Sequence, residues 1–168
     1  MLVNGKNLTT IWYDDDLDKV KIIDQRVLPH ELKIVEMSNI SEACFAIKEM
    51  QVRGAPLIGV TAAYGMFLAS KKNADIESLI ESGEKLKKTR PTAVNLSWAV
   101  DKIIKQIKEI DKNNRNEIIL QLANKIREED IIACSNIGNN GLELLESIYS
   151  KKKSTVNILT HCNAGWLA

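Results

Sequence analysis

The chain has 168 residues, enough for one domain with a sizeable hydrophobic core. Hydrophobic residues make up 45% of it, charged residues make up 27%, and the formal net charge is only +1. This composition is typical of a globular protein and excludes an intrinsically disordered chain. The balanced charge predicts neither a nucleic-acid partner nor an anionic membrane partner. No apolar run approaches the roughly 20 residues that cross a bilayer, and the first residues lack the apolar core of a signal peptide.

The first forty residues predict a small antiparallel β meander. Asn4-Gly5 is a hairpin-turn dipeptide between short apolar pieces. Segments 10–13 and 20–24 flank an acidic turn, and residues 32–37 alternate between apolar and polar side chains. Each of these three segments is typical of a short strand.

Helical patterns then take over. Ser41 is the predicted N-cap of a helix that reaches Met50. Residues 59–69 are small and apolar, which indicates a buried helix, and residues 75–88 are amphipathic. Further helices are predicted over residues 92–110 and 116–149, the last with a break or bend at Gly138 and Gly141.

The three cysteines, Cys44, Cys134 and Cys162, are odd in number, widely spaced and in no metal-ligand pattern. They predict a reduced, cytoplasmic setting and no metal site. Cys44 and Cys134 fall in helical patterns, where a free cysteine is usually a small core residue.

Cys162 differs, because it follows a β-branched run, Thr155 to Thr160, that predicts a strand. Open α/β sheets present chemistry in the turns after their strands. Cys162 can therefore be an acid–base or nucleophilic group. Alternatively, it is an inert buried cysteine, with His161 capping the turn locally.

Two further segments combine arginine with a turn and proline. Arg53, Gly54 and Ala55 precede Pro56, which fits the first turn of a helix. Amide groups that converge on a helix N-terminus favour an anion, and Arg53 can add a bidentate contact to phosphate. The alternative is a capped loop with a surface arginine.

The second such segment is Arg90-Pro91-Thr92, in which Thr92 can cap the next helix. Asn95, one turn further on, can hydrogen-bond a hydroxyl group or can simply be an exposed polar residue. Two arginine-bearing helix starts in one domain suggest a phosphate site more strongly than one.

Taken together, the segments around Arg53, Arg90 and Cys162 resemble the methylthioribose-1-phosphate isomerases, a family of methionine-salvage enzymes. The residues that carry the resemblance are Val52–Gly65, Arg90–Ala99 and Leu159–Gly165, and the opening of the chain is similar as well. The wider superfamily includes ribose-1,5-bisphosphate isomerases and regulatory subunits of the translation-initiation exchange factor.

The resemblance implies an α+β N-terminal domain, a β meander with a helical bundle, over residues 1–150. Residues 151–168 would be a linker and the first strand of a Rossmann-like α/β domain that is truncated here. A homodimer is implied for the full-length protein. The orphaned strand leads us to expect that the 168-residue chain alone self-associates, and the lack of a second catalytic group leads us to expect that it is inactive.

For the site, the resemblance implies substrate contacts from Arg53, Gly54, Ala55 and Arg90, with Cys162 as the catalytic cysteine. The implied reaction converts 5-methylthioribose 1-phosphate to 5-methylthioribulose 1-phosphate without a metal or other cofactor. A catalytic aspartate would lie in sequence beyond residue 168. The alternatives are a non-catalytic regulatory subunit, or an isomerase of 5-deoxyribose 1-phosphate or ribose 1,5-bisphosphate.

Overall fold

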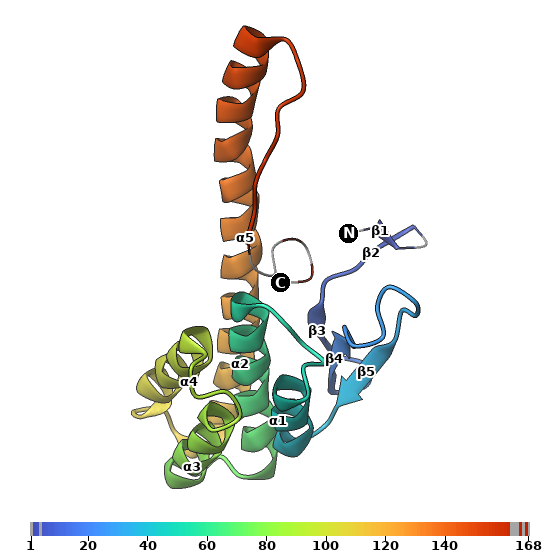
Figure 1. Cartoon of the computed structure of the whole chain (residues 1–168). Coiled ribbons are helices and arrows are strands. Elements are labelled where there is room, and N and C mark those ends of the chain that lie inside the picture. The colour runs from blue at the N-terminus through green and yellow to red at the C-terminus, as the bar shows by residue number, and fades with distance from the viewer. Residues whose placement is uncertain (1, 4, 162–164, 166, 168) are drawn as a thin grey trace.

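A computed structural model describes residues 2–3, 5–161, 165 and 167 of the chain. A small β part comes first and a helical bundle follows (Figure 1). Together they form the predicted α+β arrangement of a meander and helices. No helix in the described part of the chain is both long and apolar enough to cross a membrane.

The β part consists of a two-stranded hairpin and a three-stranded antiparallel sheet. Strands β1 (Leu2–Val3) and β2 (Lys6–Asn7) pair across Gly5, whose φ of 76° suits a glycine in a tight turn. The sheet contains β3 (Ile11–Asp14), β4 (Lys19–Ile23) and β5 (Ile34–Met37) in that order. The predicted meander is thus confirmed, with strand ends shifted by one or two residues.

The sheet turns one apolar face toward the helices. Ile11 pairs with Ile22, and Val20 pairs with Met37, and these four side chains are buried in the common core. Because alternate residues of a strand share a face, this register places the apolar side chains of all three strands together.

Helix α1 (Ile40–Lys48) begins one residue after its N-cap, Asn39. The Asn39 Oδ1 accepts a bond from the Glu42 amide at 3.1 Å, and Glu42 Oε2 accepts one from the Ser38 amide at 2.6 Å. The prediction that Ser41 caps this helix is therefore wrong. A residue three positions before a glutamate allows reciprocal capping, and Asn39 has that spacing while Ser41 does not.

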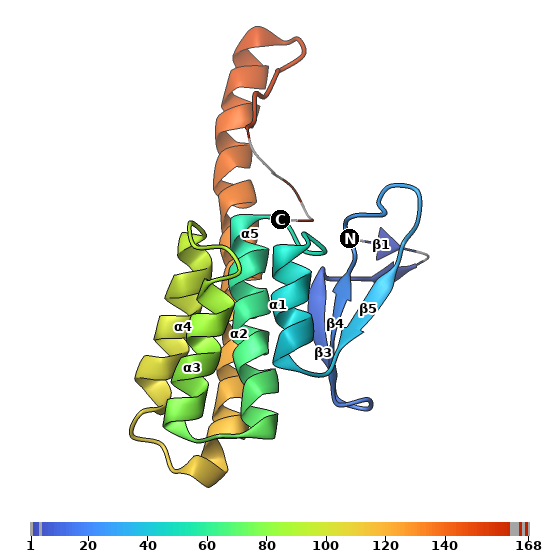
Figure 2. The ribbon, with the colours of Figure 1, turned by 60° about the horizontal axis from the view of Figure 1, so that its bottom comes forward.

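Helix α2 (Ala55–Lys72) runs through the middle of the bundle, as Figures 1 and 2 show. Every residue from Leu57 to Ser70 is buried. Its neighbours are α1, β3, α3 (Ile76–Lys87), α4 (Val94–Ile107) and α5 (Lys112–Lys152). The small residues of the predicted buried helix allow this close enclosure. Gly65, for example, leaves room for Ala43 of α1 and Leu86 of α3.

The start of α4 differs from the prediction. Ala93 is its N-cap and provides no capping side chain, while Pro91 and Thr92 lie in the turn before it. The Ala93 amide bonds to the Arg90 carbonyl at 3.0 Å, which closes that turn. Residues 89–92 reverse the chain between α3 and α4, so Thr92 is used for the reversal and not as a cap.

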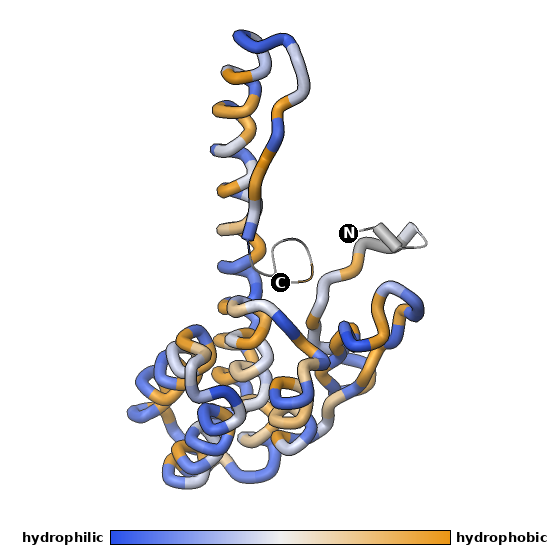
Figure 3. Tube along the Cα trace, in the orientation of Figure 1, coloured by the Kyte–Doolittle hydropathy of each residue, from blue (hydrophilic) through white to orange (hydrophobic). Residues whose placement is uncertain are grey.

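Helix α5 is continuous over 41 residues, and the predicted break at Gly138 and Gly141 is wrong. A Cβ at either glycine would meet no atom within 4 Å, so no neighbour forces a bend. The first half packs on the bundle through Ile119, Ala123 and Ile126. The second half extends away from the bundle and still carries apolar residues along its length (Figure 3).

After α5 the chain runs back along the helix toward the β part (Figure 1). The predicted strand Thr155 to Thr160 is not formed. A parallel strand needs a neighbour for its backbone bonds, and the described residues contain no strand beside it. The division of the chain at residue 150 remains a prediction.

Candidate functional site

The turn of Arg53, Gly54 and Ala55 forms the N-terminus of α2, as predicted. Gly54 is the N-cap, with φ 96° and ψ 136°, a conformation that a side chain would strain. No side chain caps this end, and the first turn holds no acidic residue. No side chain therefore compensates for the helix dipole at this end, which favours an anion. Arg53 beside it is exposed.

The sheet holds this turn in place. The Gln25 amide bonds to the Gln51 carbonyl at 2.9 Å, and the Gln51 side chain donates to Asp24 Oδ2 at 3.0 Å. Asp24, with 1% of its side chain exposed, also pairs with the Arg26 guanidinium at 2.7 Å. Arg26 first, and then Gln51, hold the pKa of Asp24 well below its ordinary value despite its burial. These bonds hold the chain at Gln51, two residues before Arg53.

Arg90 occupies a similar position at the next helix start. It is half-buried in the turn before α4, whose first turn also lacks an acidic residue and a capping side chain. Both helices run in the same direction, so their N-termini lie at the same end of the bundle (Figure 2).

A glycine brings the two helix starts into contact. A Cβ on Gly59 of α2 would lie 2.9 Å from the Asn95 carbonyl oxygen and 3.2 Å from the Asn95 Cβ in α4. Only glycine permits this approach, which places the Arg53 turn and the Arg90 turn on adjoining helices. We call these two turns, with the N-termini of α2 and α4, the anion clamp.

A small cavity of about 220 Å³ lies beside the clamp, between α2, α4 and α5. Its lining residues are Pro56, Gly59, Val60, Asn95, Trp98, Ile126, Glu129 and Asp130. Burial raises the pKa of the Asp130 carboxyl. The sequence suggested Asn95 as a hydroxyl contact, but nothing local marked Asp130, which lies within a long helix.

The predicted catalytic residue, Cys162, lies outside the described residues. Among the described residues around it, His161 is exposed and Leu167 is half-buried. The Leu167 carbonyl accepts a bond from Gln25 Nε2 at 2.7 Å. The backbone of Gln25 in turn holds the Arg53 turn, so the end of the chain approaches the clamp at this point.

The other two cysteines differ from one another. Cys44 is half-buried, and burial raises the pKa of its thiol. Cys134 is exposed, so the prediction that it is a core residue is wrong. It falls in the half of α5 that has no partner in the bundle, which its helical pattern did not reveal.

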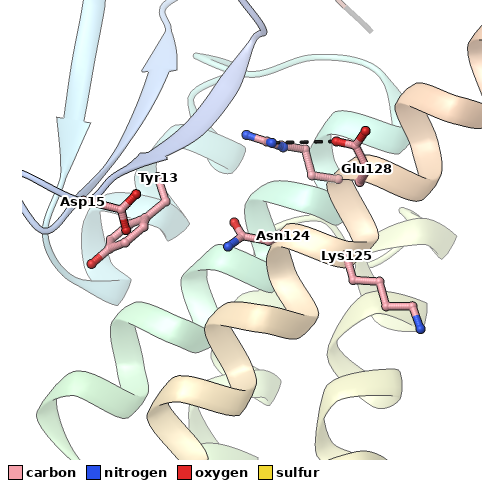
Figure 4. A pocket seen from close by; sticks show the side chains of 6 residues that line it. Tyr13, Asp15, Asn124, Lys125 and Glu128 are labelled. Carbon is pink, nitrogen blue, oxygen red and sulfur yellow. Dashed lines mark ion pairs between the residues drawn. The ribbon is translucent and has the colours of Figure 1, made fainter.

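A second cavity, of about 500 Å³, separates the sheet from α5 (Figure 4). Its lining residues are Tyr13, Asp15, Asn124, Lys125, Arg127 and Glu128. Two acidic and two basic side chains balance each other in this lining. No sequence pattern indicates this site, because β3 and α5 are far apart along the chain. No group of three or more metal-ligating side chains lies together within the part of the chain that the structure describes.

Two tyrosines near this cavity remain protonated at neutral pH. The Tyr64 hydroxyl donates to Asn124 Oδ1 at 2.7 Å, and burial raises the pKa of Tyr64 to about 12. The Tyr13 hydroxyl donates to Asp18 Oδ1 at 2.7 Å, and burial, followed by Asp18, raises its pKa to about 12. Both therefore act as fixed hydrogen-bond donors.

Comparison with known proteins identifies the family. Residues 51–168 match the model of the initiation factor 2 subunit family. The chain belongs to this family. It is 48% identical, over its whole length, to a methylthioribose-1-phosphate isomerase of Methylocella silvestris and 45% identical to that of Rhizobium meliloti. It spans 46% and 47%, respectively, of those relatives.

Two solved structures share the family fold. A 5-methylthioribose 1-phosphate isomerase from Pyrococcus horikoshii is 37% identical, with a TM-score of 0.68 over 74% of this chain and 37% of its own. A translation initiation factor eIF-2B subunit delta from A. fulgidus is also 37% identical, with a TM-score of 0.65 over 74% of this chain and 38% of its own. The α+β architecture described above is thus the one found in this family.

Proposed function

We propose that this chain provides the substrate-clamping part of an isomerase that converts 5-methylthioribose 1-phosphate to 5-methylthioribulose 1-phosphate in methionine salvage. The anion clamp is the observation that supports it: two uncapped helix N-termini, each with an arginine, adjoin at one end of the bundle. A phosphate dianion suits this arrangement. The relatives that match the whole chain carry the same activity in their names.

The proposed reaction gives each of these residues a separate role. Phosphate on C1 prevents the sugar ring from opening to a free aldehyde, so the ring must open with the phosphate in place. Arg53, Arg90 and the amides of Gly54 and Ala55 would bind the phosphate and orient the sugar. Cys162 would act at C2, and a carboxylic acid from outside this chain would protonate the ring oxygen.

Hydrogen then moves from C2 to C1. In one route Cys162 removes the C2 proton, the C1=C2 enol forms, and a proton returns at C1. In the other, hydride passes directly from C2 to C1. Both routes balance without an external oxidant or reductant, and both require the phosphate to be held firmly while the ring is open.

The partner, the location and the assembly of the protein are part of the same proposal. Its partner is a small phosphosugar and not a nucleic acid, in accord with the net charge of +1. A cytoplasmic location follows from the cysteine pattern. A homodimer of the full-length protein, and a division between residues 1–150 and 151–168, follow from the resemblance to the isomerases.

A regulatory role is the second candidate, because the eIF-2B delta subunit is as similar in sequence as the solved isomerase. A chimera can decide between the two. The 168 residues would be joined to the part of the Methylocella silvestris isomerase that they do not match, and the product ketose would be measured. We expect turnover of 5-methylthioribose 1-phosphate in preference to 5-deoxyribose 1-phosphate and ribose 1,5-bisphosphate.

Clamp variants of the same chimera test the site. Each of Arg53→Ala and Arg90→Ala removes a charge-assisted contact worth about 1.5–3 kcal/mol, so KM should rise roughly tenfold to a hundredfold. Lys88→Ala, which removes an exposed cation two residues from Arg90, is the matched control and should leave KM unchanged. A folded chimera without turnover would favour the regulatory role.

A further inference from the structure

We propose that the cavity beside the anion clamp binds the hydroxyl groups of the sugar, through Asp130, Asn95 and the indole of Trp98. The cavity adjoins the clamp, because Pro56 and Gly59 from the start of α2 and Asn95 from the start of α4 form its walls. This inference rests on the proposed function and extends it from the phosphate to the pentose. At about 220 Å³ the cavity suits part of a ligand, since sites for whole ligands are usually about 300–1,000 Å³.

Asp130 has the acceptor capacity that such a site needs. Among the described residues none gives it a hydrogen bond or an ion pair. The cations nearby along α5 and α4 are engaged elsewhere: Lys102 pairs with Glu129 at 2.9 Å, and Arg127 lies 3.8 Å from Glu128. A free carboxylate can accept two hydrogen bonds at once, which matches two neighbouring hydroxyl groups.

Asn95 and Trp98 supply donors and an apolar surface. The backbone and Cβ of Asn95 pack on Gly59, while its amide has no partner within the described structure. The Trp98 side chain is half-exposed, with Lys102 Nζ 4.7 Å from the ring centre. An indole offers both an N–H donor and an apolar face, and the C–H groups of a sugar ring pack well on such a face.

The charges also set the direction in which a ligand lies. The carboxylate of Asp130 repels phosphate, whereas the arginines and helix N-termini of the clamp attract it. A sugar phosphate therefore has one favourable orientation, with its phosphate at Arg53 and Arg90 and its hydroxyl groups at Asp130. Burial disfavours the charge of an unpaired carboxylate, so hydroxyl donors from a ligand would also restore part of its lost solvation.

The test is calorimetric titration of the 168-residue chain with inorganic phosphate and, separately, with 5-methylthioribose 1-phosphate. We expect the sugar phosphate to bind more tightly than phosphate. Asp130→Asn should weaken the sugar phosphate about tenfold or more, and Asn95→Ala about fivefold, with phosphate affinity unchanged. Asn95→Ala keeps the Cβ that contacts Gly59, and circular dichroism would confirm the fold of each variant.

Glu128→Gln is the matched control, because this carboxylate is on the same helix but lines the other cavity. It should bind both ligands as the unmodified chain does. Equal affinity for phosphate and sugar phosphate, or an Asp130→Asn chain with undiminished sugar-phosphate binding, would overturn the hydroxyl site and leave the clamp intact. Binding of neither ligand would overturn the clamp and the hydroxyl site together.

Discussion

At the residue scale, the buried charge of Asp24 connects the sheet to the turn that carries Arg53. Its carboxylate accepts bonds from the Arg26 backbone and guanidinium and from the Gln51 side chain. These donors compensate for the loss of water around the charge. Asp24 bonds to Gln51 and so joins the end of β4 to the turn that carries Arg53. The sheet thereby supports this half of the clamp.

This network predicts a pH-dependent stability. Arg26 lowers the pKa of Asp24 in the folded chain below its unfolded value of about 3.9. The contribution is therefore complete above about pH 4 and is lost as pH falls toward the lower folded pKa. Asp24→Asn should reduce the free energy of unfolding by about 1–3 kcal/mol at pH 7 and by less at pH 2.5.

Urea unfolding at the two pH values measures the effect. Asp16→Asn, at an exposed carboxylate in the β3–β4 turn, is the control and should change stability little at either pH. If Asp24→Asn reduced the free energy of unfolding equally at pH 2.5 and pH 7, the role assigned to the carboxylate charge would be contradicted.

At the element scale, the contact between α2 and α4 depends on one missing side chain. Gly59→Ala would place a Cβ 2.9 Å from a backbone oxygen, so the two helices must separate. We expect a loss of about 1–3 kcal/mol in unfolding free energy and weaker phosphate binding, because the two turns of the clamp move apart.

Gly138→Ala provides the matched comparison, since its Cβ would meet no atom within 4 Å and its helix is exposed there. Alanine should stabilise α5 locally by about 0.5–1 kcal/mol. Thermal melting and calorimetric titration with phosphate compare the two variants. If Gly59→Ala stabilised the chain as Gly138→Ala is expected to do, the contact between Gly59 and Asn95 would not be tight.

The element scale also shows what local sequence predicts and what it does not. Periodicity identified the helices, and the Arg53 turn was recognisable because glycine, proline and arginine each have a local physical role there. Residue type alone does not distinguish Ser41 from Asn39 as the cap of α1, because both types cap helices and the choice depends on Glu42. The bend expected at Gly138 needs a neighbour that packs there, and sequence alone does not contain that information.

Long-range features were the hardest to predict. The predicted strand Thr155 to Thr160 had the right composition, but pairing with another strand decides whether such a segment becomes a strand. Asp130 carries no local motif and gains its place in the cavity only when α5 packs on α2 and α4. The cavity between β3 and α5 was missed for the same reason.

At the scale of the whole molecule, the far half of α5 presents apolar side chains to solvent. Ile137, Leu144 and Tyr149 are 71%, 69% and 60% exposed. Surfaces of this kind commonly mediate association. We therefore expect the 168-residue chain to self-associate through α5, and not through the strand edge that its sequence suggested.

The chain spans less than half the length of the isomerases that it matches. We therefore expect the 168-residue chain by itself to bind phosphosugar without converting it. Light scattering after gel filtration, together with a ketose assay, tests both expectations. Replacing Ile137 and Leu144 with lysine should reduce association without affecting phosphate binding. A monomer that produces the ketose would refute both parts of this prediction.

Helix α2 makes the bundle a single cooperative unit. It touches every other helix and β3, and its residues from Leu57 to Ser70 are all buried. Releasing any one neighbour would expose part of this buried and mostly apolar helix to water, at a cost of about 25 cal/mol for each Å² of apolar surface. The elements around α2 should therefore unfold together and not one at a time. The Arg53 turn of the clamp lies at the start of this buried helix. We therefore expect it to be ordered before a ligand binds, so that binding carries no cost for ordering the helix.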